Sequence, residues 1–340
     1  MKFVSFNYKD KDRIGVMYDE FQIIDLDLAL SPEKNIPSNM IDFIKLGDQG
    51  LTLATKALMT ADSSTVINAD EVIWQPPVPH PGKICGVALN NSASNSRKIS
   101  APEHPAFFLK PASCLVGHGQ PLIMRSYYGS MHPEPELALI IGKTARDVDA
   151  VNAHDYIYGY AIFNDITGNE MRAADLFHYQ ALYASKDDPN NIEQREQHLS
   201  YAGRYKGTDG FGVLGPWLVT KDEVGDPDNL EVTCRVNGET VAEDNTRYYN
   251  YKVAEIVSFI SQFQTLSPGD VISCGTAFRP SANRKSIHQA NFLTTGGPVE
   301  ISIAKLGRQY NPIIIEQRKL GKWRLEKGSN DLKPNLLSKL

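Results

Sequence analysis

The chain has 340 residues, of which 41% are hydrophobic and 22% are charged, and its formal net charge is −5. This composition is typical of a soluble globular protein with one large domain or a large domain and a smaller partner. Without a basic excess we expect no nucleic-acid partner, and without a long apolar run we expect no membrane span.

Residues 1–75 alternate short strand-like runs with a helical stretch from about Met40 to Ala61. The proline-rich run that follows, at 76–82, fits neither a helix nor a central strand. We therefore expect a small N-terminal domain at 1–75 and a linker at 76–82. Charged residues interrupt the apolar ones at the N-terminus, so we expect no signal peptide.

The main domain is expected at 83–318, followed by a polar, basic extension at 319–340. It begins with an apolar run, Lys83 to Leu89, that predicts a buried strand, and many short strands separated by Gly and Pro turns follow. One helix is predicted after Asp149, a favourable N-cap residue, and runs through His154. A second is predicted from Lys252 to Phe263, with one apolar stripe made of Val253, Ile256, Val257, Ile260 and Phe263.

The predominance of strands argues against a doubly wound parallel sheet. The four cysteines are widely spaced and form no CxxC motif, which predicts reduced thiols in a cytoplasmic protein. The polar segment at 185–200 predicts a solvated surface insertion, with a mobile lid over the functional site as the alternative.

Two apolar runs carry carboxylates at their ends. Glu134 and Glu136 are two residues apart, so they project from the same face of a strand, and the flanking prolines restrict pairing there to an edge or a strand entry. Asp165 ends the second run. Buried carboxylates are costly without a cation, and a hard divalent metal bound by oxygen ligands would compensate them. An exposed acidic strand edge with an unrelated aspartate is the alternative.

Several motifs in chain order resemble the fumarylacetoacetate hydrolase family across about residues 80–310. The motifs are Phe108-Leu-Lys-Pro111, Glu134-Pro-Glu-Leu-Ala-Leu-Ile-Ile-Gly-Lys143, Gly159-Tyr-Ala-Ile-Phe-Asn-Asp165, the run Lys206 to Trp217, Val236-Asn-Gly-Glu239, and the run Leu266 to Thr276. The resemblance implies a mainly β fold with some α, a mixed β-sandwich roll with a small N-terminal domain that usually forms a homodimer.

The resemblance also implies a function. Family members hold Mg²⁺, Mn²⁺ or Ca²⁺ through residues that match Glu134, Glu136 and Asp165, and the motif lysine matches Lys206. Gly275 and Thr276 match residues that contact a substrate carboxylate or carbonyl. The substrates are small 2-oxo acids or 1,3-dicarbonyl acids, whose reactions pass through an enolate that a metal and a lysine stabilise.

The family's usual water-activating histidine and glutamate correspond here to Ser94 and Arg97, neither of which is a general base at neutral pH. His132, two residues before Glu134, is the best substitute base in the sequence. Arg97 is instead expected to bind a substrate carboxylate, because its planar fork matches that group.

Three functions remain open from the sequence. The first, which the bulk of the family favours and which we take as the main expectation, is a metal-dependent hydrolase that cleaves a C–C bond in a 1,3-diketo or 2-oxo acid through a metal-stabilised enolate. The second is a decarboxylase, tautomerase, isomerase or dehydratase of a 2-oxo acid on the same metal, which the changes at Ser94 and Arg97 favour. The third is a non-catalytic binding relative, against which the retention of Lys206 argues.

Overall fold

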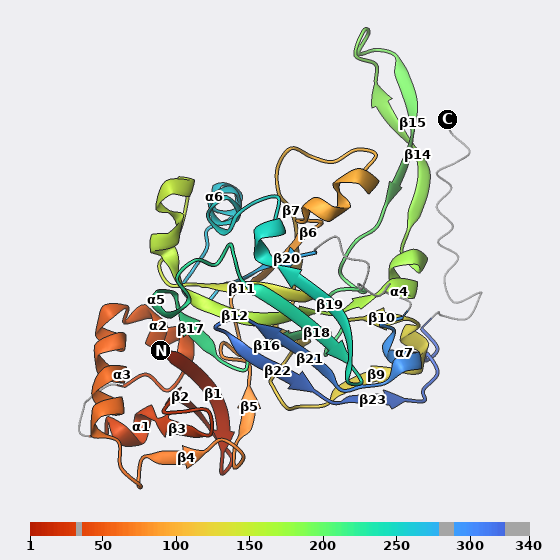
Figure 1. Cartoon of the computed structure of the whole chain (residues 1–340). Coiled ribbons are helices and arrows are strands. Elements are labelled where there is room, and N and C mark those ends of the chain that lie inside the picture. Colours follow the sequence, from red (N-terminus) through yellow and green to blue (C-terminus); the bar gives the residue numbers. More distant parts are fainter. Residues whose placement is uncertain (32–35, 279–288, 324–340) are drawn as a thin grey trace.

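The structure is a computed structural model that describes residues 1–31, 36–278 and 289–323 (Figure 1). Of the predicted C-terminal extension, only residues 319–323 lie within the described part. Strands make up most of the regular structure, as expected, and they belong to one large sheet and several small ones.

The large sheet has 13 strands, and its main path runs β4-β3-β2-β1-β17-β12-β11-β20-β6-β7. Strand β16 pairs with β12 and β8, and β5 pairs with β1. The members of this sheet are β1 (Lys2–Tyr8), β2 (Lys11–Met17), β3 (Gln22–Asp25), β4 (Val66–Asn68), β5 (Ile73–Gln75), β6 (Ile84–Ala88), β7 (Ala106–Lys110), β8 (Leu115–Val116), β11 (Pro135–Ile141), β12 (Ile157–Asp165), β16 (Gly212–Leu214), β17 (Leu218–Thr220) and β20 (Val271–Thr276). The predicted strand from Lys83 to Leu89 is thus confirmed as β6.

A second sheet of four strands, in the order β19-β18-β21-β22, lies beside the first in Figure 1. Its strands are β18 (Glu231–Val236), β19 (Glu239–Asn245), β21 (Val299–Ile303) and β22 (Gly307–Asn311). Three strand pairs complete the set: β9 (Leu122–Arg125) with β23 (Ile313–Glu316), β10 (Met131–His132) with β13 (Thr167–Gly168), and β14 (Phe177–Ala184) with β15 (Ile192–Leu199).

The helices within the described residues are short. They are α1 (Leu26–Ala29), α2 (Met40–Lys45), α3 (Asp48–Thr60), α4 (Asn169–Ala174), α5 (Lys221–Val224), α6 (Val253–Phe263) and α7 (Phe292–Thr295). The single helical stretch predicted from Met40 to Ala61 is two helices, α2 and α3, because Gly47 takes a positive φ of 54° between them.

The other two predicted helices are confirmed with changes. The one after Asp149 is a 3-10 helix, Ala150–Tyr156, and the Asp149 side chain makes no capping hydrogen bond. Helix α6 buries its predicted apolar stripe except for Phe263, whose place in the stripe was wrong: it is the last helical residue and is 63% exposed.

Strand β11 separates two parts of the core. Its alternate residues Leu137, Leu139 and Ile141 pack in one apolar cluster, with helix α6 and the four-stranded sheet. Ala138 and Ile140 pack in the other, with α2 and α3. Burial on both faces fixes the register of the strand, since a shift of one residue would exchange the two sets.

The N-terminal strands continue the large sheet, because β1 pairs with β17 through Lys2 with Val219 and Phe3 with Leu218. The division of the chain into domains at 1–75 and 83–318 remains a prediction. No helix in the described ranges is long and apolar enough to cross a membrane. All four cysteines are free and buried, as expected, and burial raises the pKa of Cys85 to about 12 and that of Cys114 to about 11.

The segment at 185–200 belongs to a β-hairpin that projects from the body of the molecule (Figure 1). Strands β14 and β15 pair from Phe177 with Leu199 to Ala184 with Ile192. Most of their side chains are exposed, which agrees with the predicted surface insertion. Its role as a lid remains a prediction.

Candidate functional site

The three predicted metal ligands lie together where β11 begins and β12 ends. Pro135 pairs with Asn164 across these antiparallel strands, so Glu134, Glu136 and Asp165 meet at one end of the pair. One carboxylate oxygen from each of the three residues lies within 4.8 Å of the other two. Strand β11 is not at a sheet edge, since β12 and β20 flank it. Of the two positions that the prolines allow, an edge or a strand entry, the structure shows the second. Pro135 is the first residue of β11, where the missing N–H of proline is tolerated.

Two lysines compensate part of this negative charge. The Lys206 ammonium donates to Glu134 Oε2 at 2.7 Å and to Asp165 Oδ2 at 2.5 Å. Lys110, whose side chain is completely buried at the end of β7, donates to Asp165 Oδ1 at 2.5 Å and to the carbonyl oxygens of Lys206 and Phe211. Asp165 therefore has an ammonium partner on each oxygen.

The two glutamates of this group differ in their pKa values because their partners differ. Burial on its own would raise the pKa of Glu134, but Lys206 and His132 outweigh it and hold that pKa well below its usual range. Burial raises the pKa of Glu136 well above its usual range, and the charges of Asp165 and Glu134 raise it further. Burial would lower the pKa of Lys206, but Asp165 and Glu134 keep it raised, so this lysine is a cation at neutral pH.

Glu136 is held by hydroxyl and amide donors from β20, the strand next to it. Ser273 Oγ and the Gly275 N–H donate to Glu136 Oε2 at 2.6 and 3.1 Å, and Thr276 Oγ1 donates to Oε1 at 3.3 Å. Gly275 has a φ of 89°, and a Cβ there would lie 2.8 Å from the Val87 carbonyl oxygen. Only glycine fits this position without strain. Gly275 and Thr276 were both predicted for substrate binding, and in the structure they orient the carboxylate of Glu136.

His132 lies beside the carboxylates on β10, and both of its ring nitrogens are engaged. Its Nε2 is 3.1 Å from Glu134 Oε1, and its Nδ1 is 2.8 Å from Asn169 Nδ2. Nε2 therefore faces Glu134 and Nδ1 faces Asn169, with the donor and acceptor roles set by the tautomer of the ring. This arrangement fixes the orientation of the imidazole and of Glu134.

The segment where the family's base would lie forms a 3-10 helix, Ser92–Arg97. Ser94 is buried, and its Oγ accepts from Arg97 Nη2 at 3.1 Å. The Arg97 guanidinium lies over the ring of Phe278, with 5.6 Å between its Cζ and the ring centroid. This helix therefore carries no imidazole or carboxylate.

Sequence reasoning gave no role to Lys110, Ser273, Asn164 or Asn169. Asn164 Oδ1 accepts from the Glu134 N–H at 3.1 Å, so it holds the backbone in front of β11. A signal for Lys110 was present, since it ends the strand-like run of motif residues Phe108-Leu-Lys-Pro111. Ser273 on β20 and Asn169 on α4 give no signal of their own, because their partners, Glu136 and His132, come from distant parts of the chain.

Residues 83–314 match the family model described as the C-terminal domain of fumarylacetoacetate hydrolase. The chain belongs to the fumarylacetoacetate hydrolase family. The expected fold, mainly β with some α in a mixed β-sandwich roll, is confirmed by solved structures of this family. The chain is an enzyme of this family, and the proteins similar to it include tautomerases and a hydrolase.

Three relatives illustrate this similarity. A mitochondrial oxaloacetate tautomerase of Bos taurus is 31% identical over 283 residues, which cover 83% of this chain and 82% of that protein. A mitochondrial oxaloacetate tautomerase of Xenopus laevis is 30% identical over 319 residues, or 92% and 90% of the two chains. The crystal structure of a maleylpyruvate hydrolase from Sphingobium sp. SYK-6, in complex with manganese(II) and pyruvate, is 27% identical with a TM-score of 0.68, and the match covers 93% of this chain and 100% of that one.

Proposed function

We propose that this enzyme interconverts the keto and enol forms of a small 2-oxo acid with the help of a divalent metal ion. The observation that carries the proposal is a metal-type carboxylate cluster without the usual water-activating pair, because Ser94 and Arg97 occupy those positions. Tautomerisation needs enolate stabilisation and proton transfer but no activated water. The similarity to proteins described as oxaloacetate tautomerases supports the same choice.

The residues present fit a hard divalent cation, Mg²⁺ or alternatively Mn²⁺ or Ca²⁺. Glu134, Glu136 and Asp165 offer only oxygen donors, which these ions prefer. Among the described residues, three carboxylates face two ammonium groups, so one negative charge is left there, and the raised pKa of Glu136 agrees with this. A bound divalent cation would compensate that negative charge and act as a Lewis acid toward the substrate oxygens.

The chain's own residues would then control the charge and the substrate. Lys206 is proposed to hold the negative charge that develops on the substrate, because its raised pKa keeps it cationic. His132, expected to be a base, has both nitrogens in hydrogen bonds, which favours a positioning role through Glu134. Arg97 is proposed to bind the substrate carboxylate, and Gly275 and Thr276 to shape the pocket beside Glu136.

The test is to follow the enol absorbance of oxaloacetate with Mg²⁺, with Mn²⁺ and with a chelator. We expect a metal-dependent acceleration of tautomerisation, which Glu136→Gln lowers at least about a hundredfold because a ligand charge is lost. Glu243→Gln, an exposed carboxylate on β19, is the control and should keep the activity. The absence of acceleration with every metal would refute the proposal.

A second candidate is hydrolysis of a C–C bond in a 1,3-diketo or 2-oxo acid. It is favoured by the similarity to the structure described as a maleylpyruvate hydrolase with bound manganese and pyruvate. Product analysis separates the two candidates. Hydrolysis yields two carboxylic acids from one substrate, whereas tautomerisation leaves the carbon skeleton intact.

We also propose a homodimer, as the family resemblance implies. Light scattering after gel filtration measures the mass directly, and a monomer at assay concentration would contradict the dimer.

The cytoplasm was expected from the free cysteines, but the animal relatives are described as mitochondrial. Free buried thiols fit any reducing compartment, so fractionation of the source cells decides between cytoplasm and mitochondrial matrix.

A further inference from the structure

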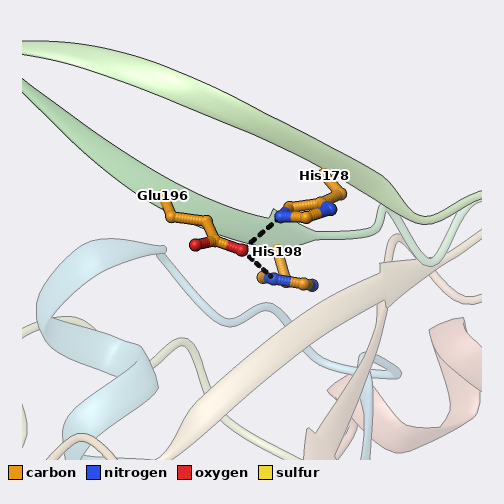
Figure 2. Close-up of side chains that lie close together, drawn as sticks. All are labelled: His178, Glu196 and His198. Carbon is orange, nitrogen blue, oxygen red and sulfur yellow. Dashed lines mark hydrogen bonds and ion pairs between the residues drawn. The ribbon is translucent and has the colours of Figure 1, made fainter.

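A second group of side chains that could bind a metal ion lies outside the carboxylate site, on the projecting β14–β15 hairpin. It consists of His178 on β14 and of Glu196 and His198 on β15 (Figure 2). Their ligand atoms lie within 4.8 Å of one another. The reaction proposed above does not use these residues, and the inference does not depend on it.

Strand register brings the three side chains together. His178 and His198 are directly opposite each other across the antiparallel pair, and Glu196 is two residues before His198. Residues two apart in a strand share a face, so all three project from one face of the hairpin. The two imidazole rings stack with 4.0 Å between their centroids and an angle of 23° between their planes.

The carboxylate of Glu196 is the point on which both imidazoles converge. One oxygen, Oε1, contacts His178 Nε2 and lies 3.3 Å from His198 Nε2, as the dashed lines in Figure 2 mark. The nearby Arg195 makes an ion pair with Glu193 at 2.9 Å and pairs with Ala181, so its side chain belongs to the other face. The cluster thus presents one carboxylate and two imidazoles without a permanent cation from this arginine.

These ligands are typical of a borderline metal such as zinc. Two histidines and one carboxylate are a ligand set found in zinc enzymes, and a tetrahedral ion would keep its fourth position for water. Zinc–ligand bonds of about 2.1 Å would place the ligand atoms about 3.4 Å apart. The side chains are 55%, 57% and 55% exposed, so they can rotate by the small amount that such closure requires.

We propose that His178, Glu196 and His198 form a binding site for a divalent transition-metal ion of the zinc type. The ion would connect β14 to β15. An isolated two-stranded hairpin is only marginally stable in water, and most side chains of this one are exposed. A metal bridge would therefore hold the two strands of the projecting arm together.

Zinc stoichiometry of the full-length protein is the first test. After equilibrium dialysis against ZnCl₂, we expect His178→Gln/His198→Gln to bind one equivalent of zinc less than the natural chain. The matched control, His104→Gln/His154→Gln, removes two exposed histidines elsewhere and should lose none. Equal stoichiometry in the two double variants would overturn the proposal.

Protection of the hairpin is the second test, and it needs no metal count. Trypsin should cleave the exposed turn after Lys186 whenever the strands separate. Zinc at ten times its dissociation constant should slow this cleavage about tenfold in the natural chain, since binding lowers the open population by that factor. The His178→Gln/His198→Gln variant should be cleaved at the same rate with and without zinc. A natural chain whose cleavage rate zinc does not change would overturn the site.

Discussion

Each carboxylate of the site has its own partners, and they explain why similar side chains differ. Asp165 has a lysine on each oxygen, and Glu134 has Lys206 and His132, whereas the donors that Glu136 has within the described ranges are neutral. Removal of one charged side chain from the site should therefore change stability and metal binding by different amounts at different positions. The lysines test this most directly, since they supply all the permanent positive charge within the cluster of described residues.

Replacement of Lys110 by methionine should destabilise the protein strongly. The change removes one partner of a completely buried ion pair and leaves Asp165 with a single ammonium, which typically costs about 3–5 kcal/mol. The control is Lys45→Met, which breaks an exposed pair with Asp42 and should cost about 0.5 kcal/mol or less. Urea denaturation measures both, and equal losses would show that burial does not set the strength of the Lys110 pair.

Replacement of Gly275 by alanine should both destabilise the protein and weaken metal binding. The new Cβ would lie 2.8 Å from the Val87 carbonyl oxygen, so β20 must shift. The shift would move the backbone N–H of residue 275 away from Glu136 Oε2, to which it donates. Gly238→Ala is the control, because its φ of 80° is similar but no atom of the described ranges lies within 4 Å of the position of its Cβ. Both variants pay the backbone strain of about 1–2 kcal/mol. Only Gly275→Ala should lose more than this and bind Mn²⁺ more weakly in a titration, and similar values for the two would contradict the clash.

At the scale of strands and helices, the sequence predicted those elements whose pattern is local. Strand β6, the buried face of α6 and the carboxylates at the ends of β11 and β12 follow from apolar periodicity and from motifs. The break between α2 and α3 depends on one backbone conformation, that of Gly47. The role of Lys110 depends on carbonyl groups about a hundred residues away, and no local pattern encodes such a contact.

Strand β15 shows a different limit. Its sequence, Ile-Glu-Gln-Arg-Glu-Gln-His-Leu, is almost entirely polar, so it lacks the alternation by which strands are predicted. The strand forms through its pairing with β14, and both faces of the pair remain largely exposed. The prediction of an exposed surface segment was therefore correct. The strand itself could not be predicted from the residues of the segment alone, because it forms by pairing with β14.

Removal of this hairpin should leave the body of the protein stable. Phe177 and Leu199 are directly opposite each other, so a two-residue Asn-Gly turn can replace residues 178–198. Of the β14 side chains only Ala181 is buried, so we expect the free energy of unfolding to change by less than about 0.5 kcal/mol. Urea denaturation and light scattering measure stability and mass. A large loss of stability or a change in mass would mean that the hairpin packs on another copy of the chain.

For the molecule as a whole, the N-terminal part and the part that carries the site are joined by more than the strand pair β1–β17. The loop at 117–120 connects β5 to β22: Gln120 Nε2 donates to the Trp74 carbonyl at 2.6 Å, and the Gly119 N–H donates to the Tyr310 carbonyl at 2.8 Å. His118 lies between them, with its ring 5.4 Å from that of Trp74. We therefore expect the contact between the two parts to depend on the protonation of His118.

Acid should weaken this contact between about pH 6.5 and pH 4. Burial, with a smaller effect of the Arg308 charge, lowers the pKa of His118 from 6.5 to about 4, and its neutral Nδ1 accepts from the Tyr310 N–H at 3.1 Å. The unfolded chain binds a proton below about pH 6.5 while the folded chain stays neutral, so a fall in pH favours unfolding. The contribution of this histidine is at most about 1.4 kcal/mol per pH unit.

The substitution His118→Asn isolates this effect, because the asparagine Oδ1 can accept the same hydrogen bond but does not titrate. Free energies of unfolding from urea denaturation at pH 7, 6, 5 and 4 should fall less steeply in this variant than in the natural chain. His154→Asn, which changes an exposed histidine, should keep the slope of the natural chain. Parallel slopes for all three proteins would mean that the joint between the two parts of the molecule does not depend on a neutral His118.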